Sequence, residues 1–188
     1  MCLHPDGQHV LTASADQTLR FWQLSAGDDA QVLRGHRAAI TSCVITADGS
    51  RAVSAAWDGT ILVWDLNGRS LHRALSEHRG AVSSLALLES GQQVVSASWD
   101  HTLRLWNLRT GALIQTFSGH AAPVNACVVT RDGKLLVSAS DDLTVRIWDL
   151  QSGRELRVLA GHNAGVKSCV LAPDGHSVIS ISEDCTLW

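Results

Sequence analysis

The sequence has no excess of positive charge. Over 188 residues, 15 Lys and Arg stand against 18 Asp and Glu, which gives a formal net charge of −3 at pH 7. A basic field is what draws a protein to nucleic acid or to an acidic membrane surface. Only Lys134 and Lys167 are lysines, and the many arginines indicate ion pairing at the surface rather than a cationic patch. Neither nucleic acid nor a membrane is therefore expected as a partner.

Long apolar runs are also missing. No stretch approaches the roughly 20 apolar residues of a membrane-spanning helix, and residues 1–6 have neither the charged start nor the apolar core of a secretory signal. The five cysteines are an odd number with no close pair, which does not indicate a disulfide framework. This use of cysteine is typical of a reducing compartment. We therefore expect a cytoplasmic protein.

Residues that hold cofactors or metal ions are not apparent. The sequence has no glycine-rich phosphate loop and no P-loop. Histidines such as His4 and His9 show no ligand spacing with cysteine, so zinc is less expected than an ordinary turn or surface histidine. The sequence thus predicts neither a cofactor nor a metal site.

What the sequence does have is repetition, with a period of 42 residues. Self-similarity at a fixed period indicates the fold before any local propensity does. Five columns of residues keep this step, from the first copy to the last: Trp22, Trp64, Trp106 and Trp148; His36, His78, His120 and His162; Asp16, Asp58, Asp100, Asp142 and Asp184; Gly7, Gly49, Gly91, Gly133 and Gly175; Thr12, Ser54, Ser96, Ser138 and Ser180.

These columns resemble the WD40 repeat family. Its signature is a Gly-His pair followed by Trp-Asp in a unit of about 40–45 residues, and here Gly119-His120 is followed by Trp148-Asp149. Glu77, Gln23 and Asn107 depart from the signature at single positions. The resemblance implies an all-β fold, a β-propeller of four-stranded antiparallel blades that pack against their neighbours.

The alternation of apolar residues and the turn signals place the strands within each repeat. Inner strands are expected near 40–45, 82–87, 124–129 and 166–171, and second strands near 9–14, 51–55, 93–97, 135–139 and 177–181. Third strands are expected near 18–24, 60–65, 102–107 and 144–149, and outer strands near 32–33, 71–74, 113–116 and 155–158. Cys43, Cys127 and Cys169 share one inner-strand position and are expected in the core.

The repeats form one expected domain, residues 1–188, with units at 35–76, 77–118 and 119–160. Residues 1–34 form a partial unit and residues 161–188 an incomplete one, which makes about four and a half repeats. A propeller typically has 4–8 blades, so we expect a fragment of a longer propeller. A small imperfectly closed ring and a half-propeller that closes by dimerising are the alternatives. Open blade edges favour self-association.

Each complete unit carries His, Ser, Asp and Trp at fixed offsets. Ser, His and Asp invite comparison with a hydrolase triad, but a catalytic set is needed once and this one recurs in every unit. The resemblance implies instead a buried network of hydrogen bonds, in which indole N–H, hydroxyl, imidazole and carboxylate satisfy one another. The expected members are His36, Ser54, Asp58 and Trp64; His78, Ser96, Asp100 and Trp106; His120, Ser138, Asp142 and Trp148.

Candidate partner-binding residues occupy two other columns. One precedes the repeated Asp and contains Trp57, Trp99 and Asp141, on the face that the resemblance implies meets partners. Exposed tryptophan is enriched at interface hot spots. The alternative is that each indole lies flat over its own hairpin. The second column, on the inner strands, is Thr41, Ser83, Asn125 and Lys167, whose mixed polarity does not indicate a phosphopeptide pocket.

The function we expect is that of a non-catalytic scaffold that binds a protein or peptide through one propeller face. The alternative is a regulatory or sensor region of a larger signalling protein, such as an NTPase or kinase fusion. An enzyme with its site in the central channel is a third hypothesis. No unique acid, base or nucleophile outside the repeated network supports it, so we do not expect an enzyme.

Overall fold

The computed structural model describes residues 1–25, 30–175 and 177–188, and all regular structure within them is β-strand. The strands are β1 (Cys2–Leu3), β2 (His9–Ala13), β3 (Thr18–Gln23), β4 (Ala30–Arg34), β5 (Ile40–Ile45), β6 (Arg51–Ala56), β7 (Ile61–Asp65), β8 (Ser70–Leu75), β9 (Val82–Leu87), β10 (Gln93–Ser98), β11 (Thr102–Asn107), β12 (Leu113–Ser118), β13 (Val124–Val129), β14 (Leu135–Ser140), β15 (Thr144–Asp149), β16 (Glu155–Ala160), β17 (Val166–Leu171) and β18 (Val178–Ser182).

The strands pair in chain order into antiparallel sheets. Blade 1 is β1-β2-β3-β4, blade 2 is β5-β6-β7-β8, blade 3 is β9-β10-β11-β12 and blade 4 is β13-β14-β15-β16, while blade 5 is the pair β17-β18. The fold class predicted from the sequence is thus confirmed. The four predicted inner strands have the observed bounds, and β8, β12 and β16 extend beyond the predicted outer strands by one to two residues at an end.

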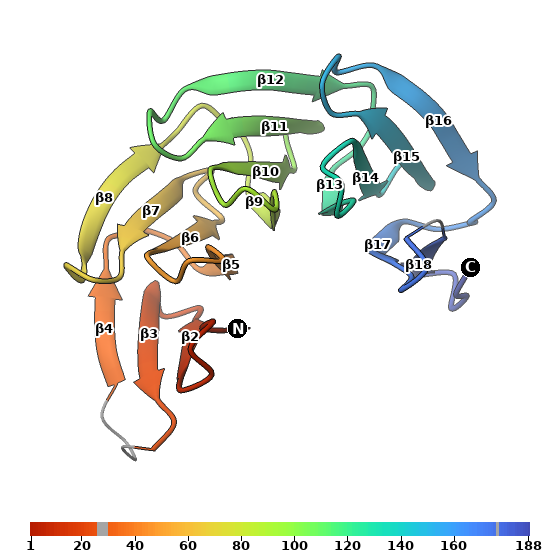
Figure 1. The fold of residues 1–188 in the computed structure, drawn as a ribbon. Coiled ribbons are helices and arrows are strands. Elements are labelled where there is room, and N and C mark those ends of the chain that lie inside the picture. The colour runs from red at the N-terminus through yellow and green to blue at the C-terminus, as the bar shows by residue number, and fades with distance from the viewer. Residues whose placement is uncertain (26–29, 176) are drawn as a thin grey trace.

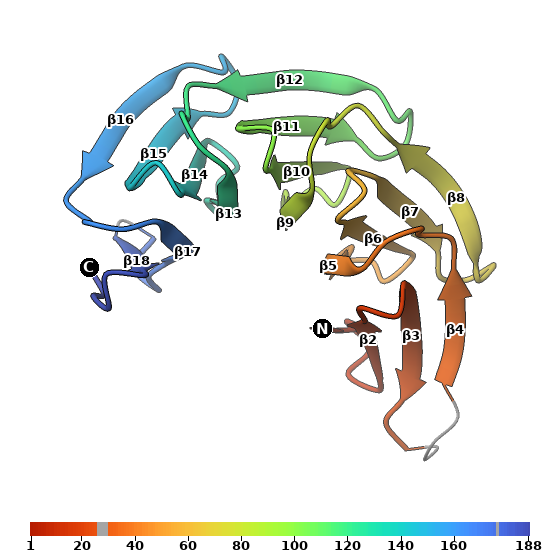
Figure 2. The ribbon, with the colours of Figure 1, turned by 180° about the vertical axis from the view of Figure 1, so that it is seen from behind.

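The blades stand side by side in an open arc. Figure 1 shows β4, β8, β12 and β16 along the outer rim and β5, β9, β13 and β17 along the inner side, and the view from behind in Figure 2 shows the same order. The arc is not closed into a ring. The terminal sheet leaves apolar side chains such as Val170 and Ile181 about half exposed. Self-association through such edges stays a prediction.

Burial falls from the second strand of each blade towards its rim. The strands β6, β10 and β14 are buried along nearly their whole length, whereas β16 is exposed throughout. A second strand has a strand of its own blade on either side and a neighbouring blade over each face, so both of its faces are covered. This explains why its residues are mostly small or apolar and do not alternate between buried and exposed positions.

The core is a series of layers between blades. One cluster joins blades 1 and 2 around Leu11 and Trp64, a second joins blades 2 and 3 around Val53 and Trp106, and a third joins blades 3 and 4 around Val95 and Trp148. A fourth joins blades 4 and 5. Stability in such a fold is approximately a sum over repeats and their nearest-neighbour interfaces, so a change in one layer is felt first by the two blades that share it.

The turn between the second and third strands keeps one conformation throughout the chain. Its last residue has a positive φ in every copy, at Gln17, Gly59, His101, Leu143 and Cys185. Only at Gly59 is this free of the cost that a Cβ brings in the left-handed region. The Asp just before the positive-φ residue offsets that cost, because its carboxylate accepts the N–H of the Thr just after it. Asp100 Oδ1, for example, accepts the Thr102 N–H at 3.1 Å.

Cys43, Cys127 and Cys169 are buried as expected, and all five cysteines are free. The spacing in the sequence did not show that Cys2 Sγ and Cys43 Sγ lie 3.7 Å apart. A separation of 41 residues is one repeat less one position, and the inner strands of adjacent blades bring such positions together. Within the described residues, no helix has the length and apolarity to cross a membrane.

Candidate functional site

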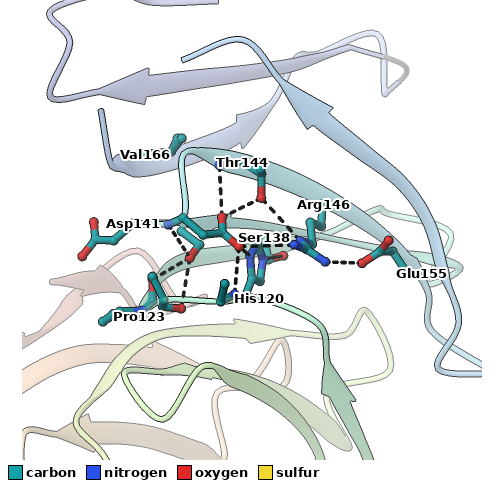
Figure 3. A network of polar contacts seen from close by, with 12 residues as sticks. His120, Pro123, Ser138, Asp141, Thr144, Arg146, Glu155 and Val166 are labelled. Carbon is teal, nitrogen blue, oxygen red and sulfur yellow. Dashed lines mark hydrogen bonds and ion pairs between the residues drawn. The ribbon is translucent and has the colours of Figure 1, made fainter. Parts of the chain in front are cut away.

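The repeated His, Ser, Asp and Trp form one connected chain of hydrogen bonds in blade 4. Trp148 Nε1–H donates to Ser138 Oγ at 2.9 Å, and Ser138 Oγ lies 2.7 Å from His120 Nε2. His120 Nδ1 lies 2.7 Å from Asp142 Oδ2. Figure 3 shows His120 and Ser138 pointing towards one another. Because a carboxylate only accepts, Nδ1 of the imidazole carries the proton, and the serine hydroxyl donates to Nε2.

Blade 3 repeats this geometry with His78, Ser96, Asp100 and Trp106. Blade 2 differs in one link. His36 Nε2 and the Trp64 indole both contact Ser54 Oγ, but His36 Nδ1 lies 3.1 Å from Thr60 Oγ1 instead of a carboxylate oxygen. That hydroxyl in turn donates to Asp58 Oδ1 at 2.6 Å. Asp58 therefore closes the chain of hydrogen bonds through threonine rather than directly.

The serine of this network is not placed to act as a nucleophile. Ser54, Ser96 and Ser138 have no exposed surface. Each hydroxyl oxygen already accepts the N–H of a fully buried indole, as Ser96 does from Trp106 at 2.8 Å. A nucleophile must be accessible to its substrate, whereas these hydroxyls are enclosed by the core of the protein. The set therefore links the loop before the inner strand to the third strand, once in each of blades 2, 3 and 4.

Burial sets the protonation of the network's members. Burial lowers the pKa of His36 and of His120, since the charged imidazolium would lose its hydration there. Burial alone would raise the pKa of Asp142, but hydrogen bonds from Thr144 and His120 outweigh it and lower that pKa to about 2. In blade 4 at neutral pH, His120 is therefore neutral and Asp142 is ionised.

These shifts predict a loss of stability in mild acid. The unfolded chain binds a proton at each histidine near pH 6.5, whereas His36 and His120 resist protonation in the folded chain. Between the two pKa values the unfolded state binds more protons, so stability rises with pH there and falls as the pH is lowered below about 6.5. The depressed pKa of Asp142 adds a further loss only below about pH 4. Calorimetric melts between pH 8 and pH 4.5 would show this, and a melting temperature that rises on acidification would contradict it.

Removing the carboxylate of blade 4 is expected to destabilise that blade. In Asp142→Ala the His120 Nδ1–H loses its acceptor, and so does the Ala121 N–H, which donates to the same oxygen at 3.1 Å. The unsatisfied His120 N–H is buried and costs about 1–3 kcal/mol, whereas water can replace the acceptor of the exposed Ala121 N–H. Asp142→Asn keeps an acceptor oxygen and is expected to lose less. Urea unfolding measures the difference, with the exposed turn residue in Glu89→Ala as the matched control. Equal stability of Asp142→Ala and the control would refute the structural role.

The candidate column before the repeated Asp lies in the turns that end the second strands. Trp57 N–H donates to the Ala39 carbonyl at 3.0 Å and Trp99 N–H to the Ala81 carbonyl at 2.8 Å, so each turn is tied to the start of its own inner strand. The two indoles lie in adjacent blades with ring centroids 5.3 Å apart and planes at 51°. They remain 57% and 43% exposed.

Glycine allows the two turns to approach this closely. A Cβ on Gly59 would meet the carbonyl oxygens of His78 and Gly80 at 3.0 Å, and a Cβ on Gly80 would meet the Asp100 backbone nitrogen at 2.8 Å. The turn of blade 2 therefore packs on the loop of blade 3, which packs in turn beneath Trp99. The contact between the indoles follows from that stacking.

The same column continues into blades 4 and 5 with charged residues. Asp141 Oδ1 accepts from Asn125 Nδ2 at 2.7 Å and from Lys167 Nζ at 2.7 Å, and Lys167 also lies 3.1 Å from Glu183. Figure 3 shows Asp141 directed away from His120, on the other side of the turn. Two tryptophans are thus followed, blade by blade, by two carboxylates that share one ammonium group.

The inner-strand candidates are the extra residues of β-bulges. Register shifts in the pairs β5–β6, β9–β10, β13–β14 and β17–β18 leave Thr41, Ser83, Asn125 and Lys167 unpaired in their ladders. A bulge re-aims a side chain. Thr41 donates to the Val82 carbonyl, Ser83 to the Val124 carbonyl at 2.6 Å, and Asn125 to the Val166 carbonyl at 3.0 Å.

These three side chains therefore hydrogen-bond each inner strand to the next blade, and their hydrogen-bonding capacity is used within the protein. Lys167 is the most exposed member of the column. The sequence reasoning did not identify this link. Its signal is the separation of 41 residues between donor and acceptor in all three blades, the same offset that brings Cys2 to Cys43.

The chain belongs to the WD40 family. The family model described as "WD domain, G-beta repeat" matches residues 1–23, 27–65, 68–107, 111–149 and 153–188. Among curated proteins, human WD repeat-containing protein 86 is 42% identical over 43 residues, which is 23% of this chain. The matched part is 11% of that protein's length. Repeats of this family generally mediate contacts between proteins, and its propellers are generally non-catalytic.

Proposed function

We propose that the chain is a non-catalytic interaction module that binds a basic protein segment on the Trp57–Trp99 surface, the face formed by these two indoles and the turns beside them. The observation that carries the proposal is the pair of half-exposed indoles in contact across two blades. Exposure of the apolar tryptophan side chain to water is unfavourable, and tryptophan is enriched among the hot-spot residues of protein interfaces. The interpretation that each indole only covers its own hairpin does not account for the contact between them.

The charge of the surrounding turns indicates the chemistry of the partner. Along the turns after the second strands and the loops before the inner strands, carboxylates outnumber cations: Asp16, Asp58, Glu77, Asp100, Asp141, Asp142, Glu183 and Asp184 against Arg37 and Arg79, with Lys167 nearby in β17. A negative field raises the rate at which a basic ligand arrives. An Arg or Lys side chain over an indole gains a cation–π attraction of about 0.5–2 kcal/mol.

The site of such a cation would be next to the Trp57–Trp99 pair, where Asp58 and Asp100 follow the two indoles directly in the sequence. Both carboxylates are held by their own turns: Asp58 accepts the Thr60 N–H at 3.0 Å and Asp100 the Thr102 N–H at 3.1 Å. They therefore contribute field without needing to be desolvated. In this proposal the chain acts as a scaffold that holds the basic segment of its partner, and it does so in the cytoplasm.

The experiment is fluorescence anisotropy with labelled peptides. A panel of Arg-containing peptides is compared with the same peptides in which each Arg is replaced by Gln or Glu. We expect saturable binding of members of the basic set only, with an affinity that falls as salt is raised, because exposed charges are screened. Preference for the Glu-containing set, or binding indifferent to both charge and salt, would contradict the proposed partner chemistry.

A further inference from the structure

The first hairpin of the chain carries a cluster of polar side chains that its repeats do not. His4, Asp6 and His9 lie in and beside the turn between β1 and β2, and one ligating atom from each falls within 4.8 Å of the others. His9 Nδ1 lies 2.7 Å from Asp6 Oδ2, and His4 Nδ1 lies 3.0 Å from Asp6 Oδ1. All three side chains are partly exposed, at 17%, 37% and 27% of their surface in chain order.

The other repeats serve as an internal control for what the hairpin itself requires. The position of His4 is taken by Thr46, Leu88, Thr130 and Ala172, and that of His9 by Arg51, Gln93, Leu135 and Ser177. Where the position holds threonine, its hydroxyl donates to the turn carboxylate at 2.6 Å, as in Thr46 to Asp48 and Thr130 to Asp132. The hairpin therefore forms without histidine, and the two imidazoles around Asp6 need another explanation.

The surroundings of His4 favour the tautomer that leaves Nδ1 without a proton. Nε2 of the ring lies 3.1 Å from the Gly49 carbonyl oxygen, and the Asp6 backbone N–H donates to Nδ1 at 3.3 Å. A neutral imidazole has one N–H and one lone pair. With the proton on Nε2, that N–H donates to Gly49, and the Nδ1 lone pair lies beside Asp6 Oδ1 at 3.0 Å. Nδ1 and the carboxylate are therefore placed to share a ligand.

The orientation of both rings is also fixed in advance. His9 stacks on Phe21 with centroids 4.8 Å apart and planes at 3°, and His4 meets the same ring edge-on at 5.7 Å. Donation of the remaining ring N–H to a backbone carbonyl, as from His4 to Gly49, is the usual support of a metal-binding histidine. Asp6 is likewise held, since its Oδ1 accepts the Gln8 N–H at 2.8 Å.

We propose that His4, Asp6 and His9 form a binding site for a divalent transition-metal ion, with Nδ1 of both imidazoles and a carboxylate oxygen as ligands. Two imidazoles and one carboxylate are a donor set that suits Zn²⁺, and three protein ligands leave a coordination position open to water or to a partner. Tetrahedral ligands on zinc lie about 3.3 Å apart, so the ion draws the more distant pair of atoms together. The site is on blade 1, separate from the Trp57–Trp99 surface.

The test is calorimetric titration of the tag-free chain with ZnCl₂. We expect one saturable site, lost or weakened at least about 100-fold in His4→Thr and in His9→Leu, since even supporting residues of a metal site are worth 10–100-fold. Both replacements are residues that the chain itself uses at these positions in repeat 4. His72→Gln, an exposed histidine of β8, is the matched control and should bind as the unaltered chain does.

A second measurement separates this site from the cysteines. With Co²⁺ in place of zinc, we expect weak visible d–d absorption without a thiolate charge-transfer band. No saturable binding, binding unchanged in both variants, or a thiolate band would each overturn the proposal. Far-UV circular dichroism of the two variants checks that the hairpin's neighbours are folded, and Asp6→Asn provides an independent ligand substitution if either variant is not.

Discussion

Trp106→Ala is expected to lower the free energy of unfolding by about 3–5 kcal/mol, the range for removing a large buried aromatic side chain. The indole is 1% exposed and belongs to the layer between blades 2 and 3. Its loss leaves a cavity beside Val53 and Leu85 and takes the N–H donor from Ser96. Urea unfolding followed by circular dichroism measures the change. Because neighbouring blades share this layer, both should lose protection in hydrogen exchange before blade 4 does.

The matched control is the other tryptophan of the same blade. Trp99 is 43% exposed and contacts Trp57 with ring centroids 5.3 Å apart, so Trp99→Ala is expected to cost only about 1 kcal/mol, well below the loss in Trp106→Ala. Trp106→Phe removes the N–H donor and part of the indole but keeps an aromatic ring, so its loss is expected to be smaller than that of Trp106→Ala. Equal losses in Trp106→Ala and Trp99→Ala would mean that the blade layers are not the source of stability described here.

Trp57→Ala and Trp99→Ala are each expected to weaken binding of a basic peptide about 30-fold or more. A hot-spot side chain is worth at least about 2 kcal/mol on truncation, and each 1.4 kcal/mol is a factor of ten in affinity. Anisotropy with the Arg-containing peptides gives the dissociation constants. Since the two indoles are in contact at 5.3 Å, their effects should not be additive in the double variant.

Ile114→Ala is the matched control for this prediction. Ile114 is 46% exposed on the outer strand β12, away from the turns that carry Trp57 and Trp99. It should bind peptide as the unaltered chain does. Loss of binding in Ile114→Ala comparable to that in the tryptophan variants, or unchanged binding in all three, would place the partner elsewhere on the protein.

The fold could be predicted because every repeat has the same residue types at the same positions. A Trp such as Trp148, a Gly in each hairpin and a His 28 residues before that Trp recur with the same period, and the strands between them follow from turns and apolar residues. The network around Ser138 was predictable for the same reason, since the donors and acceptors of its four members complement one another. Blade 2 was not predictable in this detail, because Thr60 lies between His36 and Asp58 and replaces their direct hydrogen bond.

The contacts between neighbouring blades could not be predicted from the repeat. The links from Thr41, Ser83 and Asn125 to the next blade depend on β-bulges, and a bulge shifts the register without a signature of its own in the sequence. The approach of Cys2 to Cys43 depends on the same offset of 41 residues. A period of 42 shows which residues are equivalent, whereas contact requires the position that lies opposite in the neighbouring sheet.

The cluster of His4, Asp6 and His9 was missed for a different reason. The expectation of no metal site rests on the spacing of histidine with cysteine, whereas this cluster combines histidine with a carboxylate. Its signal was present as a departure from the repeat, because no other copy has histidine at either position. In a repeat protein, the residues that all copies share indicate the fold. Residues that occur in one copy only are the better candidates for a binding site.

The recurring tryptophans hold the blades together, and we propose that Trp57 and Trp99 meet the partner. The most direct measurement is a ¹H–¹⁵N NMR titration of the indole N–H signals of the seven tryptophans with a basic peptide, assigned by single Trp→Phe variants. We expect the signals of Trp57 and Trp99 to shift saturably while those of Trp64, Trp106 and Trp148 stay in place. Shifts confined to the buried indoles, or saturable binding that leaves Trp57 and Trp99 unmoved, would contradict it.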